Sequence, residues 1–295
     1  MDQAEQLRNI IKTQVQPKTV SRVITVTSGK GGVGKTGLSV NLAIQLQRMG
    51  KKVVILDADF GLANIEVMLG VRPTANLADL MFKGKSLKDI IMTGPEGIGF
   101  ISGGSGIKEL ASLSRDQIYY VMQSLTELDD IADVIIVDTG AGISDSVLEF
   151  AAASEEVLLV ATPEPTSITD AYALLKTLNR TQQFQASRTV IKLVANKVKT
   201  QQEGKEIFGK VSVVAEKFLN IQLEYLGAVL NDGHVSKAVM LQKPWLLAYP
   251  NSPASDSIVS LASVLEQNGI EYMQKKKGIK RLFTNLIQSR IRKAR

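Results

Sequence analysis

A run of glycines that ends in lysine and threonine carries the clearest chemical signal in this sequence. It reads Gly29-Lys30-Gly31-Gly32-Val33-Gly34-Lys35-Thr36, between an apolar strand-like run at 22–27 and a helix-like pattern that starts at Leu38. Glycines let the backbone close around phosphates and point its N–H groups at them. The following helix adds unpaired N–H groups and the positive end of its dipole. The pattern therefore predicts a nucleotide-binding P-loop.

Residues of this loop have predicted roles in the chemistry. Lys35 is expected to reach the β- and γ-phosphates, and the Thr36 hydroxyl is expected to hold Mg²⁺. An accidental glycine-rich turn is the alternative, but the strand before the motif and the helix after it argue against one. The predicted phosphate-binding residues are Gly29, Lys30, Gly31, Gly32, Val33, Gly34, Lys35, Thr36 and Gly37.

Acidic residues follow two further strand-like runs. Asp57 and Asp59 come after the run at 53–56, and Asp138 ends the run at 134–137. An apolar strand that ends in aspartate is typical of Walker B, in which the carboxylate holds Mg²⁺ through water. Each motif alone could be a structural cap, because aspartate often ends strands. Together with the P-loop, they predict a Mg²⁺ site with Thr36, Asp57 and Asp138 as ligands.

These motifs carry a family resemblance. Lys30 before the glycines resembles the deviant Walker A of the MinD/ParA class of P-loop ATPases, and the two acidic motifs match its switch regions in order over roughly 20–268. The resemblance implies that the chain binds ATP and forms an ATP-bound homodimer in which Lys30 reaches the partner's phosphates. It also implies that Asp59 positions the hydrolytic water. Lys30, Lys35 and Asp59 are therefore the expected catalytic residues.

The chain departs from this family pattern at two positions. Gly37 stands where a second hydroxyl residue is usual, and Gly140 replaces a frequent proline. Asn196 follows a strand in Asn-Lys-Val-Lys, which lacks the acidic residue of a guanine reader because Lys199 occupies its place. The resemblance suggests that Asn196 contacts adenine; an ordinary strand-end asparagine is the alternative.

Composition excludes several chemistries. The 295-residue chain has no cysteine, so disulfides, thiolate metal sites and iron–sulfur ligation are absent. His234 is the only histidine, which excludes a multi-histidine metal site. The polar start does not resemble a signal peptide, and no apolar run approaches the roughly 20 residues of a membrane span. We expect a cytoplasmic protein that associates with the membrane peripherally and reversibly.

Strand-like and helix-like runs alternate through the core of the chain. The strand runs are short and continuously apolar, as expected for strands covered on both faces. This alternation predicts an α/β fold with a doubly wound, mostly parallel sheet of about seven or eight strands. The predicted strands are 23–28, 53–56, 98–102, 134–137, 157–161, 190–195 and 226–230, and the helices are 38–49, 115–128, 146–153, 168–178, 201–218 and 255–268.

The basic charge is concentrated at the C-terminus. Nine of the 35 basic residues and none of the 29 acidic ones lie in 275–295, so the rest of the chain has a net charge of −3. Apolar residues at helical spacing form one stripe there, which favours a helix lying in an anionic membrane surface over one docked on the protein itself. It resembles the membrane-targeting helix of MinD. The predicted membrane residues are Ile279, Lys280, Arg281, Leu282, Phe283, Leu286 and Ile287.

The N-terminus narrows the resemblance. Residues 2–8, Asp-Gln-Ala-Glu-Gln-Leu-Arg, resemble the activator segment of the flagellum-number regulators FlhG, also called YlxH or FleN. The resemblance implies that this segment stimulates FlhF, a flagellar GTPase of the signal-recognition-particle type, through Gln3, Gln6 and Arg8. It also implies contacts with flagellar C-ring proteins. A self-docked helix is the alternative.

We therefore expect three parts: an activator segment at 1–18, a MinD-like ATPase domain at 19–274 and a membrane-targeting helix at 275–295. The predicted function is a membrane-cycling ATPase that controls flagellar number and placement. A MinD-type cell-division ATPase and a ParA-type partition ATPase that binds DNA are the alternatives. The acidic body and the apolar stripe argue against DNA, so no specific nucleic acid is expected.

Overall fold

Eight strands form one sheet in the computed structural model of the chain, which describes residues 20–59, 64–104, 120, 123–181, 184–272 and 278–293. The order across the sheet is β3-β4-β2-β5-β1-β6-β7-β8, and every neighbouring pair is parallel except β3 with β4. The predicted α/β fold with a doubly wound, mostly parallel sheet is confirmed. The strands are β1 (Arg22–Thr27), β2 (Val53–Ala58), β3 (Ile91–Thr93), β4 (Gly99–Ile101), β5 (Val134–Thr139), β6 (Glu156–Ala161), β7 (Val190–Val198) and β8 (Leu223–Leu230).

Strand β1 lies inside the sheet, between β5 and β6. From β1 the chain builds one half of the sheet through β2, β4 and β5, and it then builds the other half through β6, β7 and β8. The two halves diverge at the carboxyl end of β1. Open α/β sheets bind their ligands at such a switch point.

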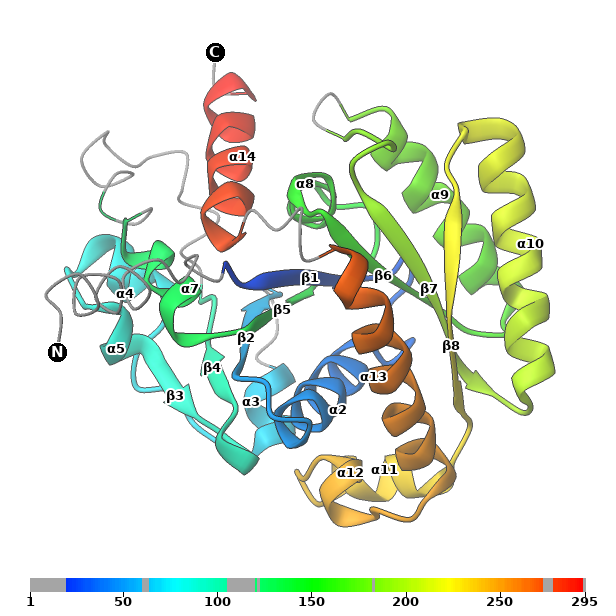
Figure 1. Ribbon diagram of the computed structural model, residues 1–295, viewed down its shortest axis with the longest axis horizontal. Helices are drawn as coiled ribbons and strands as arrows, with labels where there is room; N and C mark the ends of the chain where they lie inside the picture. The colour runs from blue at the N-terminus through cyan, green and yellow to red at the C-terminus, as the bar shows by residue number, and fades with distance from the viewer. Residues whose placement is uncertain are drawn as a thin grey trace, which may run out of the picture.

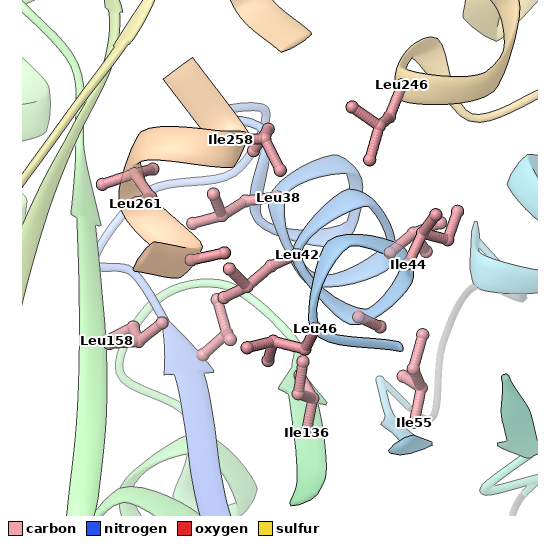
Figure 2. Close-up of a cluster of buried hydrophobic side chains, with 14 of the residues drawn as sticks. Leu38, Leu42, Ile44, Leu46, Ile55, Ile136, Leu158, Leu246, Ile258 and Leu261 are labelled. Carbon is pink, nitrogen blue, oxygen red and sulfur yellow. The ribbon is translucent and has the colours of Figure 1, made fainter. Parts of the chain in front are cut away.

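Helices α2 (Lys35–Arg48) and α13 (Pro253–Tyr272) cover one face of the sheet (Figure 1). Leu38, Leu42 and Leu46 recur every four residues, so they share one side of α2. Figure 2 shows this side turned toward α13 and the sheet. These leucines are fully or almost fully buried, so this apolar side fixes α2 and the loop before it. The shorter α3 (Asn64–Leu69), α11 (Gly233–Met240) and α12 (Trp245–Ala248) lie beside them.

The opposite face carries α7 (Leu128–Ile131), α8 (Asp145–Ala153), α9 (Pro165–Asn179) and α10 (Gln201–Leu219). The C-terminal helix α14 (Gly278–Lys293) packs on the same face, against α7, α8 and β1. Its apolar stripe is part of the buried cluster on this face, with each side chain at most 6% exposed. The buried residues of this stripe are Ile279, Leu282, Phe283, Leu286 and Ile287.

This docking corrects the expectation of a stripe that faces a membrane. An amphipathic helix buries its apolar side on whatever apolar surface is in reach, and here the sheet beside α8 offers one. Arg281 is paired with Glu155 at 3.2 Å, whereas Lys280 is exposed. In this conformation the alternative of a self-docked helix holds, and membrane contact through the stripe would require α14 to leave the sheet.

All seven predicted strands are present, with ends shifted by a few residues. The short antiparallel β3 was missed, as were α4 (Leu77–Phe82), α5 (Leu87–Ile90) and the 3₁₀ turn Pro95–Gly97. The predicted helix at 115–128 lies largely outside the described residues. So does the activator segment at 1–18 with Gln3, Gln6 and Arg8. Within the described ranges, every helix is too short or too polar to span a bilayer.

Candidate nucleotide-binding site

The glycine-rich loop joins the carboxyl end of β1 to the start of α2. Gly32 and Gly34 have φ values of +74° and +94°, in the left-handed region that favours glycine. Gly34 caps α2 without any side-chain hydrogen bond, and the first turn of α2 holds no acidic residue. Neither the cap nor the first turn of α2 thus supplies an acidic side chain to its first N–H groups, which suits them to phosphate.

Lys35 lies at the first position of α2 with its side chain largely buried. Its ammonium donates a hydrogen bond to the Ser28 hydroxyl at 2.9 Å. Burial lowers the pKa of Lys35, and the nearby charges of Asp138 and Asp59 partly oppose this. Because Ser28 begins the loop, the ammonium is held at the loop's base, where a phosphate group would attract it.

Asp138 lies near the carboxyl end of β5, beside the start of α2. Its carboxylate accepts a hydrogen bond from the Ser39 hydroxyl at 2.8 Å, and it also bonds with the Thr36 side chain. Burial raises the pKa of Asp138 to about 6, although both hydroxyls and Lys35 lower it. Two predicted Mg²⁺ ligands, Thr36 and Asp138, are therefore in direct contact, and Ser39 also holds the carboxylate; their binding of the ion stays a prediction.

Asp57 lies directly opposite Asp138 on the neighbouring strand β2. Burial is the main cause that raises the pKa of Asp57 to about 8, while the backbone N–H of Asp59, at 2.9 Å, lowers it. A side chain on Gly140 would place its Cβ 3.3 Å from the Asp59 carboxylate. The glycine that departs from the family pattern thus leaves room for Asp59, and the three predicted carboxylates meet at one edge of the sheet.

This donor set fits Mg²⁺. Burial raises the pKa values of Asp57 and Asp138, so their charged forms are costly in this site. A divalent cation would stabilise both carboxylates in the charged form. Magnesium is typically held by one or two carboxylates, with phosphates and water completing the shell. Thr36, Asp57 and Asp138 would hold the ion.

Lys30 is bound by the start of α9 rather than by its own loop. Its ammonium contacts the Glu164 carboxylate and donates a hydrogen bond to the Thr166 hydroxyl at 2.8 Å. About a third of the Lys30 side chain is exposed. A partly exposed pair of this kind is weak enough to open. Lys30 therefore lies at the rim of the site, bound to residues at the start of α9. Its contact with the phosphates of a second protomer stays a prediction.

Asn196, at the carboxyl end of β7, lies against the loop. Its side-chain amide donates to the Val33 carbonyl at 2.7 Å, and the neighbouring Lys197 donates to the Gly32 carbonyl, also at 2.7 Å. Lys197 has a φ of +59°, which turns the chain at this point. The predicted adenine reader is thus brought to the loop, and its contact with the base stays a prediction.

Several residues of this site were not identified from the sequence. Ser28, Ser39 and Glu164 each bond a predicted site residue, but a lone serine or glutamate has no spacing signal. Ser39 lies one helical turn after Thr36, which places both hydroxyls on the side of α2 that faces β5. That helical spacing is the signal that could have found it.

Comparisons with known proteins agree with this geometry. A family model described as "ParA: NUBPL iron-transfer P-loop NTPase" matches residues 19–266. The antiactivator FleN of Pseudomonas aeruginosa is 43% identical over 245 residues, which cover 83% of this chain and 86% of FleN. The flagellum site-determining protein YlxH of Helicobacter pylori is 34% identical over 297 residues, covering 97% and 98%. In the MinC:MinD cell division protein complex of Aquifex aeolicus, a chain superposes with a TM-score of 0.65 at 25% identity, covering 84% of this chain and 96% of that one.

Proposed function

Because the chain belongs to the ParA/MinD family of P-loop NTPases, we propose that it is an ATPase whose nucleotide-dependent cycle on the membrane regulates flagellar number and placement. The observation that carries the ATPase part is the convergence of the P-loop with Asp57, Asp59 and Asp138 at one sheet edge. The similarity to FleN and YlxH along most of the chain supports the flagellar part. The iron-transfer chemistry in the family model's description does not suit this chain, which has no cysteine.

The residues divide the chemistry among them. The N–H groups of the loop and of α2 bind phosphate oxygens, and Lys35 moves from Ser28 to the β- and γ-phosphates. Thr36, Asp57 and Asp138 would hold Mg²⁺, which would supply positive charge to the phosphate oxygens. Asp59 orients the attacking water. The Ser39 hydroxyl donates to the Asp138 carboxylate and keeps it in place.

Hydrolysis depends on dimerisation in this proposal. Lys30 leaves Glu164 and reaches the phosphates of the second protomer, where its charge stabilises the transition state. A monomer that retains the pair of Lys30 with Glu164 would bind ATP but hydrolyse it slowly. The geometry supports this proposal through one feature, because Lys30 is the single lysine of the loop that is held away from the loop's base.

Two substitutions test the ATPase assignment. Lys35→Ala removes the phosphate lysine, so we expect loss of ATP binding in calorimetry. Asp59→Ala leaves the phosphate contacts in place, so we expect retained binding with hydrolysis reduced by on the order of 100-fold or more. Lys51→Ala serves as a matched control, because Lys51 follows α2 and pairs with Glu266 at the far end. Normal hydrolysis by Asp59→Ala would contradict the assigned role.

The membrane part of the cycle uses α14. A dimer presents two such helices, and the second binds at the high effective concentration that the first creates. ATP would therefore favour membrane residence, and hydrolysis would favour release. Flotation with anionic vesicles should recover more protein with ATP than with ADP, and a substitution of Phe283 by aspartate should abolish the difference. Equal recovery with ATP, ADP and no nucleotide would overturn this part.

The N-terminal segment supplies the partner-specific part. We propose that residues 1–18 stimulate the flagellar GTPase FlhF through Gln3, Gln6 and Arg8, and that other surfaces contact C-ring proteins. GTP hydrolysis by FlhF should rise several-fold with the full chain, and the combined Gln3→Ala and Arg8→Ala variant should lose that rise. Thr13→Ala is the control within the same segment. A rise that survives in the double variant would remove this role.

Cell-division positioning is the second candidate, because the superposition with a MinC:MinD complex covers nearly the whole solved chain. FleN and YlxH match a larger share of identical residues than that structure does. The measurement of FlhF stimulation separates the two functions, because a MinD-type cell-division ATPase would have no use for the N-terminal segment.

A further inference from the structure

Gly37, the residue that departs from the family's loop pattern, has an explanation in the packing. A Cβ built on Gly37 would lie 2.5 Å from Cζ3 and 3.0 Å from Cη2 of Trp245. Real Cβ contacts essentially never come this close to a ring, so no larger residue fits while Trp245 keeps its place. Trp245 begins α12 and is 4% exposed. The space that a second hydroxyl residue would use is therefore taken by the edge of an indole.

A second contact ties the same two segments together. Asn41 is fully buried one helical turn after Gly37, and its amide donates to the Gly37 carbonyl at 2.8 Å. The oxygen of that amide accepts the N–H of Leu246 in α12 at 2.9 Å. Asn41 thus bridges the first turn of α2 and the first turn of α12. A buried amide with both ends satisfied holds its partners at fixed distances.

The Trp245 ring contacts Gly37 through van der Waals packing and not through a hydrogen bond. Its indole N–H has no hydrogen-bond partner among the residues that the structure describes. The methyl group of Met68 in α3 also lies 3.6 Å from the Gly37 Cβ position. Trp245 therefore lies where α2, α3 and α12 meet, in contact with the first turn of α2 at Gly37. The N–H groups of that turn face the predicted phosphate site.

We propose that Trp245 is a positioning residue for nucleotide binding and that α12 responds to the occupied site through Trp245 and Asn41. The inference rests on the proposed nucleotide binding at the P-loop. The N–H groups of positions 36 and 37 can grip phosphate only if the first turn of α2 holds its place, and Trp245 sets that place from outside the helix. Coupling between two sites is reciprocal: if the position of Trp245 changes the affinity for nucleotide, bound nucleotide must also change the preferred position of Trp245.

A size-swap experiment tests the positioning role. Gly37→Ala forces the new methyl into the indole, so binding of ATPγS with Mg²⁺, measured by calorimetry, should weaken about tenfold, or roughly 1.4 kcal/mol. Adding Trp245→Leu to Gly37→Ala makes room for the methyl and should restore most of the affinity. Gly209→Ala is the control, because a Cβ there meets no atom within 4 Å. Unchanged affinity in Gly37→Ala, or a loss that Trp245→Leu does not relieve, would overturn the role.

A spectroscopic test uses the unaltered protein. Trp245 is the only tryptophan of the chain, so its fluorescence reports one position. Saturating ATPγS with Mg²⁺ should change the emission of the wild type, and Asn41→Ala should reduce that change while calorimetry still detects binding. An unchanged emission at saturation would sink the proposal even if the substituted proteins fail to fold.

The two proposals fail in different ways. If calorimetry finds no binding of ATPγS to the wild type, the proposed nucleotide function is wrong. If binding is found but the tryptophan emission does not respond and the size swap gives no recovery, only the role of Trp245 is wrong. Recovery in the double variant together with a fluorescence response supports both.

Discussion

At the scale of single residues, a buried charge cluster lies at the opposite end of the strands from the nucleotide site. Glu156 in β6 accepts two hydrogen bonds from Arg22 and one from Lys192, at 2.7 to 2.8 Å. Burial alone would raise the pKa of Glu156, but these partners more than offset it and hold the pKa below its usual value. Glu156→Gln leaves two buried cations poorly matched, so unfolding free energy should fall by about 3–5 kcal/mol.

The same pKa shift gives a pH dependence with a definite sign. A carboxylate whose folded pKa is depressed contributes stability above its unfolded pKa, and this contribution is lost as the pH falls through the folded value. Denaturant melts from neutral to acid pH should therefore lose stability more steeply in the wild type than in Glu156→Gln. Glu96→Gln, which removes an exposed pair with Arg48, is the control and should cost roughly 0–1 kcal/mol. Parallel pH curves would contradict the assignment.

Residue types and spacing were enough to expect Lys35 at the start of a helix and Asp57 and Asp138 near the ends of strands, and the structure places them there; their roles toward phosphate and Mg²⁺ stay predictions. Their supporting partners were not predictable in the same way. Trp245 comes from a segment about 200 residues away from Gly37 and Asn41 in the chain, and only the fold brings it to them.

At the scale of elements, the start of α14 is tightly constrained. Gly278 has a φ of +65°, and a Cβ there would lie 2.4 Å from Val20 and 2.5 Å from the Asp129 carboxylate. That carboxylate also accepts the N–H of Ile279. Gly278→Ala should therefore loosen the docked helix, at a cost of roughly 1–3 kcal/mol. Limited proteolysis should cleave α14 faster in this variant.

The control for this substitution is Gly209→Ala in the middle of α10, where an added Cβ meets no atom within 4 Å. Alanine is the better helix former there, so stability should rise by up to about 1 kcal/mol. If proteolysis of α14 is equally fast in both variants, the tight start of the helix does not hold it in place.

Elements with a strong period were predictable, and those set by tertiary contacts were not. Continuous apolar runs identified seven strands, whereas the three residues of β3 form a strand only because β4 lies beside them. The apolar stripe of α14 was recognised from its spacing, but its partner was misjudged. Spacing shows that a helix has an apolar side, and it does not show whether protein or lipid covers that side.

At the scale of the whole molecule, charge and topology separate the surfaces. Five of the nine basic residues of 275–295 lie within the bounds of α14, which packs against α7, α8 and β1, while Lys30 and the P-loop lie at the carboxyl end of β1. Helix α14 touches α8, and residues 140–144 join α8 to β5, the strand that carries Asp138. One short segment thus connects the site for Mg²⁺ with the docked helix, which gives the proposed cycle a direct structural route.

The dimer itself can be tested by mixing two inactive variants. In the proposed dimer each site uses its own Asp59 and the lysine at position 30 of the second protomer. A pair of Lys30→Ala with Asp59→Ala then contains one complete site, on the Lys30→Ala protomer. An equal mixture in which half of the dimers are mixed should regain roughly a quarter of the wild-type hydrolysis rate.

The matched control replaces Lys30→Ala by Lys35→Ala. Lys35 serves the nucleotide of its own protomer, where its ammonium is held at the base of the loop by Ser28. A pair of Lys35→Ala with Asp59→Ala therefore contains no complete site and should stay inactive. Recovery in the first mixture alone requires Lys30 to act across the dimer. If the first mixture also stays inactive, the proposed action of Lys30 across the dimer is wrong.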